Sequence, residues 1–162
     1  MRIRTVTPNN HRKAFEVSLP SGTLAFPYAK ASPPPTARDR IVECAVDPEL
    51  GREGFTYRLQ SGHEGSIHVE QVLEYNQDPR YLRDLMLHEL KVAALRCLKT
   101  TALSKREITR RLGTSATQFY RLLDPTNTRT SVDQLLALLH ILECDVRLVI
   151  RPKPMPRRPR AA

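Results

Sequence analysis

The sequence predicts an α+β protein in which a small β-rich N-terminal domain is followed by an all-α domain. The main observation is a change in the hydrophobic period. Between residues 15 and 69, apolar and polar residues alternate in short segments, which is typical of half-buried strands. After Pro79 the apolar residues recur every three to four positions, which is typical of amphipathic helices. We therefore place the domain boundary near residue 77.

The charge distribution supports the same division. Residues 1–80 contain ten basic and ten acidic side chains, whereas residues 81–162 carry the entire net charge of +9. A positive field confined to one half is expected of a polyanion-binding module joined to a neutral one. The predicted organisation is a domain at 1–77, a domain at 78–150, and a disordered, basic, proline-rich tail at 151–162. Phosphate attraction and a solubilising role both stay open for the tail.

Local patterns place the strands of the first domain. Two alternating segments, Phe15–Leu19 and Leu24–Tyr28, flank a Pro-Ser-Gly turn and predict a hairpin. The prolines within 31–36 predict a loop, because proline cannot donate to a sheet ladder. The other predicted elements of this domain are three strands and a short helix, at Ile41–Val46, Phe55–Gln60, Ser66–Val69 and Gln71–Tyr75.

The second domain is predicted to begin with a longer amphipathic helix that has Asp78 as its cap. Three serine motifs then mark the starts of three further helices. Each serine is followed three positions later by Glu or Gln, which is the pattern of a capping box. The three pairs are Ser104 with Glu107, Ser115 with Gln118, and Ser131 with Gln134. They predict helices at 105–112, 116–123 and 132–142, the first of which ends at Gly113.

The packing of these helices can also be predicted. Two helices of about eight residues joined by a glycine-containing turn form a helix-turn-helix unit. Four apolar residues should lock the angle between them: Ile108, Leu112, Phe119 and Leu122. The third helix should turn four leucines toward the same core, namely Leu135, Leu136, Leu139 and Leu142.

The segments LSKREITRRLGTSATQFYRLL and SVDQLLALLHIL, starting at Leu103 and Ser131, resemble the Xre family of Cro/repressor-like domains. This resemblance implies a lambda-repressor-like fold and a transcription regulator that binds double-stranded DNA sequence-specifically, with helix 116–123 in the major groove. Thr109 departs from the small alanine usual in the family. The ending 145–150 looks like the short terminal strand of antitoxin-type members. The N-terminal half resembles a small uncharacterised bacterial β-rich domain, which implies no activity.

The resemblance assigns roles along the two helices. The residues implied to read bases are Ala116, Thr117, Gln118 and Arg121, with Thr117 and Arg121 ranked first because Gln118 is needed to close a capping box. The residues implied to contact the DNA backbone are Ser104, Lys105, Arg106, Arg110, Tyr120, Thr128, Arg129 and Thr130. A helix-packing role is an alternative for Tyr120, and Arg111 is expected to be a solvated charge.

The last helix and the segment after it contain more apolar residues than a small domain can bury. We therefore expect a homodimer, with an interface formed by Leu138, Ile141, Val146, Leu148 and Ile150. The competing expectation is that 145–150 adds a strand to the N-terminal sheet, which would hide the same edge within one chain.

Nothing in the sequence supports catalysis, and we expect no cofactor and no metal site. His63-Glu64 and His68 resemble a zinc-protease motif, but their spacing is five rather than four and a Ser-Gly turn precedes them. The three cysteines lie far apart, which favours reduced thiols in a cytoplasmic protein. No secretion signal or membrane-spanning segment is expected.

Two other functions stay open. The first is an antitoxin or adaptor whose N-terminal domain binds a protein partner, while the second domain binds DNA for autorepression. The second is binding of single-stranded RNA, which is less favoured because the basic half offers few aromatic side chains for base stacking.

Overall fold

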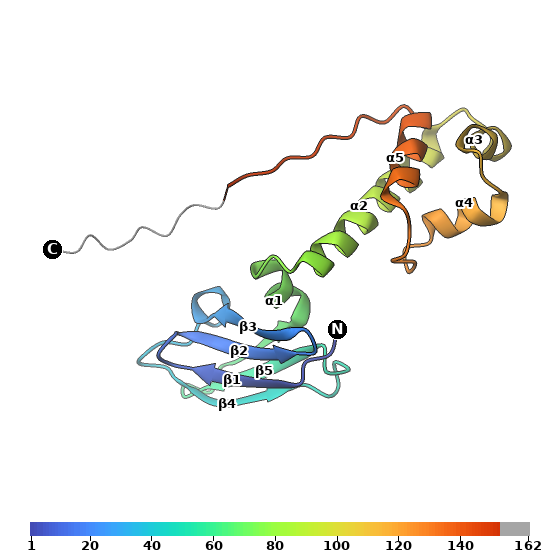
Figure 1. The fold of residues 1–162 in the computed structure, drawn as a ribbon. Coiled ribbons are helices and arrows are strands. Elements are labelled where there is room, and N and C mark those ends of the chain that lie inside the picture. Colours follow the sequence, from blue (N-terminus) through green and yellow to red (C-terminus); the bar gives the residue numbers. More distant parts are fainter. Residues whose placement is uncertain (153–162) are drawn as a thin grey trace. The chain divides into compact units, whose positions relative to one another are not determined.

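The computed structural model describes residues 1–152 and shows an α+β chain in which the strands precede the long helices (Figure 1). The chain divides into two compact units, Met1–Leu85 and Met86–Ala162. The division falls inside the first long helix, several residues after the boundary predicted at residue 77. Positions 153–162 of the predicted tail lie outside the described residues.

Two three-stranded antiparallel sheets form the first unit. The first has the order β1-β2-β3, with strands Thr5–Asn9, Ala14–Leu19 and Gly22–Pro27. The second has the order β4-β5-β6, with strands Ile41–Val46, Gly54–Leu59 and Glu64–His68. A 3-10 turn, η1, lies at Tyr28–Lys30 directly after β3, and helix α1 spans Val69–Tyr75 after β6. The predicted hairpin, the three further strands and the short helix are all confirmed to within a few residues.

Strand β1 was not predicted. It contains Pro8, which cannot donate a ladder hydrogen bond, and Val6 is its only buried residue. Both features are explained by its position, because β1 pairs only with β2 and so forms an edge of its sheet. Proline is tolerated on edge strands.

The core of the first unit is centred on Phe15, which is fully buried. Its ring lies 4.9 Å from the ring of Tyr28, 5.1 Å from Phe55 and 5.0 Å from Tyr57, measured between centroids. Side chains of both sheets therefore meet in one aromatic cluster. Gly65 is required beside this cluster, because a Cβ atom there would lie 2.3 Å from the Tyr57 ring.

Four helices follow in the chain. They are α2 (Pro79–Thr100), α3 (Lys105–Leu112), α4 (Ala116–Leu123) and α5 (Val132–Ile141). Asp78 caps α2 as predicted, since its carboxylate accepts hydrogen bonds from the amides of Arg80 and Tyr81. Gly113 adopts the left-handed conformation expected at the end of α3, with φ of 67°.

The serine caps are confirmed, but only as half of each predicted box. The hydroxyls of Ser104, Ser115 and Ser131 each accept a hydrogen bond from the amide three residues later. Glu107 does not reach back and pairs with arginines of its own helix instead. The reciprocal box does occur at α1, between His68 and Gln71, where the sequence analysis did not place one.

The inner face of α5 differs from the prediction. Leu135, Leu138 and Leu139 are buried, whereas Leu136 is 38% exposed. The buried set continues to Leu142 and so follows the spacing i, i+3, i+4, i+7. Leu138 is therefore wrong as a dimer-interface residue, because its side chain is used by the core of its own unit. Ile141 is half-buried against the same core.

The predicted terminal strand at 145–150 is also wrong. This segment has no regular secondary structure and forms no ladder with the described strands, so neither an added strand nor a hidden edge is present. A strand needs a neighbour, and the described part of the second unit contains only helices. The side chains of Val146, Leu148, Val149 and Ile150 are consequently exposed, the last by 82%.

A buried lysine joins α2 to the loop between α4 and α5. Lys91 is only 1% exposed, and its Nζ atom donates hydrogen bonds to the carbonyl oxygens of Asp124, at 2.7 Å, and Asn127, at 2.5 Å. Burial lowers the pKa of Lys91, and the nearby Asp124 carboxylate partly offsets this effect. The ammonium group thus bonds to the carbonyl of Asp124, the cap residue of α4, and to that of Asn127 in the following loop, and so ties this loop to α2.

Lys91→Met is expected to destabilise the second unit by about 2 kcal/mol, because two carbonyls lose a charged donor and keep only their bonds from the Asn127 amide and the Thr130 hydroxyl. Urea unfolding should show this loss, and amide exchange should accelerate in the 124–130 loop. Lys99→Met on the exposed side of α2 is the matched control and should change neither measurement. Unchanged stability and unchanged exchange in Lys91→Met would contradict the conclusion that Lys91 holds the loop between α4 and α5.

Candidate nucleic-acid interface

Helix α4 has one buried face and one exposed polar face. Phe119, Leu122 and Leu123 are buried, which confirms the predicted burial of the first two. The exposed face is formed by Ala116, Thr117, Gln118, Tyr120 and Arg121. Because the buried residues fix the rotation of the helix about its axis, the exposed set is held toward solvent as a group. All four residues predicted to read bases belong to it.

The polar groups of this face are available for a ligand. The Ser115 hydroxyl accepts a hydrogen bond from the backbone amide of Gln118 at 3.2 Å, so the cap does not use the glutamine side chain. Within residues 1–152, the side chains of Gln118 and Arg121 make no hydrogen bond or ion pair. The carbonyl of Arg121 accepts from the Asn127 side chain at 3.1 Å, which ties the end of α4 to the following loop.

Lys105 and Tyr120 connect the start of α3 to this face. The Lys105 Nζ atom lies 3.4 Å from the Tyr120 hydroxyl and 5.5 Å from the centre of its ring. The tyrosine is 56% exposed, so it does not serve mainly as a packing residue. A hydroxyl and an ammonium group side by side form a pair of donors suited to phosphate oxygens.

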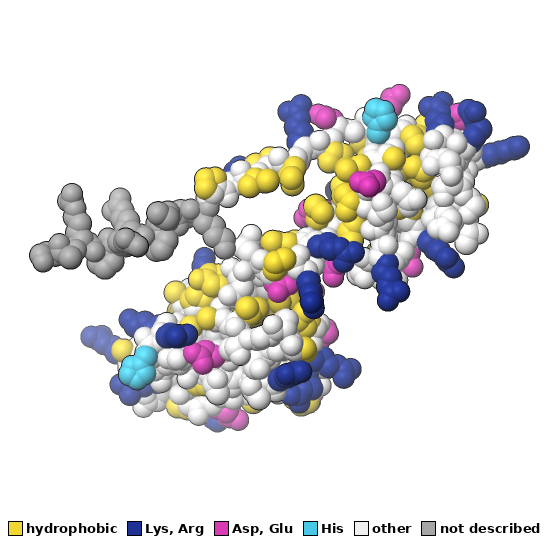
Figure 2. Space-filling model, viewed as in Figure 1, with side chains coloured by type: hydrophobic (Ala, Val, Ile, Leu, Met, Phe, Trp, Pro, Cys, Tyr) yellow, Lys and Arg dark blue, Asp and Glu magenta, His cyan; other side chains and the backbone are white. Residues whose placement is uncertain are grey.

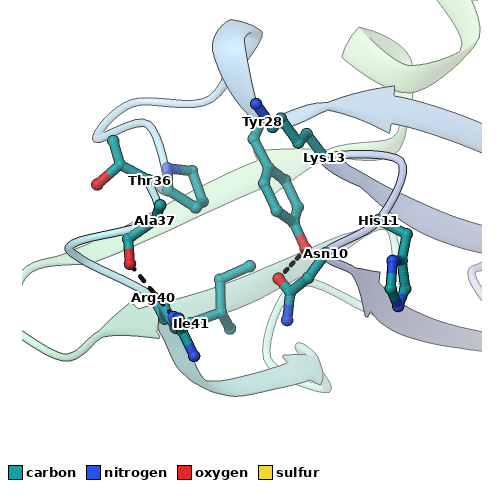
Figure 3. A pocket seen from close by; sticks show the side chains of 9 residues that line it. Asn10, His11, Lys13, Tyr28, Thr36, Ala37, Arg40 and Ile41 are labelled. Carbon is teal, nitrogen blue, oxygen red and sulfur yellow. Dashed lines mark hydrogen bonds between the residues drawn. The ribbon is translucent and has the colours of Figure 1, made fainter.

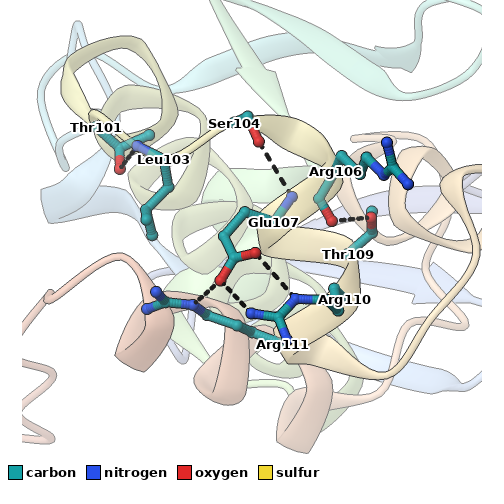
Figure 4. Close-up of polar contacts among 8 residues, drawn as sticks. All are labelled: Thr101, Leu103, Ser104, Arg106, Glu107, Thr109, Arg110 and Arg111. Atoms are coloured by element: carbon teal, nitrogen blue, oxygen red, sulfur yellow. Dashed lines mark hydrogen bonds and ion pairs between the residues drawn. The ribbon is translucent and has the colours of Figure 1, made fainter.

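An acidic residue moderates the charge of α3. Figure 4 shows Glu107 between Arg110 and Arg111, with Arg106 pointing away from the group. The Glu107 carboxylate is 2.9 and 2.7 Å from Nε and Nη2 of Arg110, and 2.7 Å from Nε of Arg111. These arginines lower the pKa of Glu107 to about 2, and the pKa of Arg110 rises correspondingly. Arg110 is thus already paired, whereas Arg106 has no such partner in the described chain.

The loop after α4 contributes less than predicted. Thr130 is 8% exposed, and its hydroxyl donates to the carbonyl of Asn127 at 3.0 Å. It is therefore wrong as a DNA-backbone residue, because it is used to shape the loop. Thr128 and Arg129 are exposed beside it. Asp124 accepts hydrogen bonds from the Thr126 amide and hydroxyl, and these bonds lower the pKa of Asp124.

Two residues that position this surface were missed by the sequence analysis. Lys91 holds the loop by donating to its carbonyls, and Asn127, within the loop, bonds back to α4. A signal for Lys91 was present, because it lies at helical spacing between Leu87 and Ala94, both of which are buried. In Figure 2, Lys and Arg side chains project from the surface of the second unit.

No family model, curated protein or solved structure matches this chain. Within residues 1–152 there is no group of three or more His, Cys, Asp or Glu side chains able to hold a metal ion. The same residues contain no helix with both the length and the apolar character needed to cross a membrane.

The ion pairs of Glu107 with Arg110 and Arg111 predict that the stability of the second unit depends on pH. Because the folded-state pKa of Glu107 is lowered to about 2, the stabilisation it provides is complete above about pH 4.5 and is lost as the pH falls toward 2. Glu107→Gln should remove this part of the acid dependence in thermal unfolding between pH 2 and 5. Glu89→Gln, an exposed position on α2, should keep the parent profile. Identical profiles for Glu107→Gln and the parent would contradict the pairing.

Proposed function

We propose that this protein is a sequence-specific transcription regulator that binds double-stranded DNA, with α3 and α4 as a helix-turn-helix and α4 in the major groove. The observation that carries the proposal is the exposed face of α4, where the side chains of Gln118 and Arg121 have no hydrogen-bond partner among residues 1–152. A helix with such a face fits the width of the major groove. The resemblance of this stretch to Xre domains agrees with it, and a cytoplasmic location follows from the proposal.

Specific and non-specific contacts would come from different residues. Arg121 can bond bidentately to guanine and Gln118 to adenine, while the methyl of Thr117 suits thymine. Lys105, with Tyr120, and Arg106 would contact phosphates, which set the register of the helix without reading sequence. Gln118 gains importance relative to the expectation from sequence, because its amide is not used in a cap.

Arg121→Ala is expected to weaken binding to a selected site by about 1–3 kcal/mol and to relax the preference at one base pair. The site would first be obtained by selecting bound duplexes from random DNA with the full chain. Arg121→Lys is the matched control for charge, since it keeps the cation and loses the planar fork, so it should also lose the preference. Equal losses on selected and random DNA would move Arg121 to the phosphate-contacting group.

We also propose that the protein acts as a homodimer whose interface includes the segment Val146–Ile150, with Ile141 at its edge. The support is the exposure of Val146, Leu148 and Ile150, since consecutive exposed apolar side chains favour association. A two-fold axis would place two α4 helices about 34 Å apart on one side of the DNA and select inverted repeats.

Replacing both Leu148 and Ile150 by Asp is expected to shift the protein from dimer to monomer in sedimentation velocity at micromolar concentration. The double change should leave the fold of the single chain intact, as judged by its circular dichroism, because neither side chain is buried within one chain. Arg147→Ala within the same segment is the control and should leave the dimer intact. A monomeric parent whose selected sites lack inverted symmetry would contradict the dimer.

A second candidate is favoured by the same exposed segment. In an antitoxin or adaptor, a protein partner rather than a second copy would cover Val146–Ile150, or would bind the first unit, and DNA binding would serve autorepression. The sedimentation experiment tests the first of these arrangements, because a partner on Val146–Ile150 requires a parent that stays monomeric alone. A complex with the product of a neighbouring gene would support the antitoxin or adaptor in either arrangement.

A further inference from the structure

The first unit contains a cavity of about 510 Å³. It lies between the turn that joins β1 to β2 and the proline-rich segment after η1. In Figure 3 the Tyr28 ring stands at its centre, with Lys13 above and Arg40 below in that view. The volume falls within the range of about 300–1,000 Å³ that is usual for small-molecule sites.

The lining of this cavity is positively charged, although the unit as a whole is nearly neutral. It includes His11, Lys13 and Arg40 and no carboxylate. In the described chain the side chains of His11 and Lys13 have no hydrogen-bond or ion-pair partner. Arg40 donates from Nε to the carbonyl of Ala37 at 3.2 Å, which orients its guanidinium and leaves the terminal nitrogens unused.

The acidic residue next to Arg40 in the chain makes its hydrogen bonds elsewhere. Asp39 precedes Arg40, but its carboxylate accepts hydrogen bonds from the amide of Ser61 at 2.8 Å and from its hydroxyl at 2.7 Å. Those bonds lower the pKa of Asp39 and fix it toward the β5–β6 turn. Asp39 forms no ion pair with Arg40 or Lys13 in the described chain, so both cations can pair with a bound anion.

The remainder of the lining is rigid and largely apolar. The Tyr28 ring packs on Phe15, and its hydroxyl donates to the Asn10 side chain at 3.2 Å. Pro35 is buried and Ile41 half-buried beside it. A preformed apolar floor next to cations suits a molecule with an apolar or planar body and one anionic group.

Lys13 occupies an unusual backbone conformation. Its φ is 50°, in the left-handed region where glycine is the favoured residue. The turn is held there because the carbonyl of Lys13 accepts a hydrogen bond from the amide of Tyr28 at 2.8 Å. Strained backbone beside a cavity is a reason to test Lys13 as a functional residue.

We propose that this cavity binds a small organic anion, a carboxylate or phosphate carried on an apolar or aromatic body. Lys13 and Arg40 hold the anionic group, and the body packs on Tyr28 and Pro35. The site belongs entirely to the first unit and does not depend on DNA binding by the second.

The ligand class is tested by following amide shifts of the full chain while titrating phenyl phosphate, benzoate and benzyl alcohol. The two anions are expected to shift amides of residues 10–13 and 36–41, and the neutral alcohol at the same concentration is not. Equal shifts with benzyl alcohol, or anion shifts outside these segments, would overturn the proposal.

The assigned residues are tested by Lys13→Gly and Arg40→Gln, each expected to weaken phenyl phosphate binding about tenfold through loss of a charge-assisted contact. Lys13→Gly should fold at least as stably as the parent, since glycine accepts the positive φ. Arg12→Gln, a neighbouring cation outside the lining, is the control and should bind like the parent. Parent-like binding by both variants, or an equal loss in the control, would contradict the assignment.

Discussion

The exposed face of α4, which we propose contacts DNA, depends on the hydrogen bonds that Lys91 makes inside the second unit. An ammonium group in an apolar core is costly unless it is fully hydrogen-bonded, and here it bonds to carbonyls at the end of α4 and in the following loop. The same cation lies at the negative end of the α4 dipole, where positive charge is favourable. Removing its positive group would release the loop and, with it, the end of α4.

In addition to Lys91, four residues fix the orientation of α4 and of its exposed face. Phe119 and Leu122 set the rotation of α4, the αL turn at Gly113 sets its angle to α3, and Asn127 bonds back to its last turn. Glu107 pairs with Arg110 and Arg111 and so reduces the positive charge of α3, while Arg106 has no ion-pair partner within residues 1–152. The result is an exposed polar face beside a positive charge that Glu107 reduces, which suits the sequence-specific binding proposed for this surface.

Local signals were enough to predict most elements and the α4 face, because caps, periodicity and turns act within a few residues. Tertiary packing decided the rest. The leucine-rich α5 allows more than one buried stripe, so sequence alone misassigned Leu138 to an interface. Burial of Thr130 depends on a loop shape that Lys91 imposes from another helix. The cavity was invisible in the sequence because it joins residues 10–13 to 35–41 across two sheets.

The most direct test of the account is photo-crosslinking of the full chain to its selected duplex, with benzoylphenylalanine placed at position 118 or at position 140. Gln118 is at the exposed start of α4, whereas His140 is exposed in the last turn of α5. We expect crosslinks to bases inside the selected site from position 118 and none from position 140. Crosslinking from position 140 with none from position 118 would contradict the placement of α4 in the major groove.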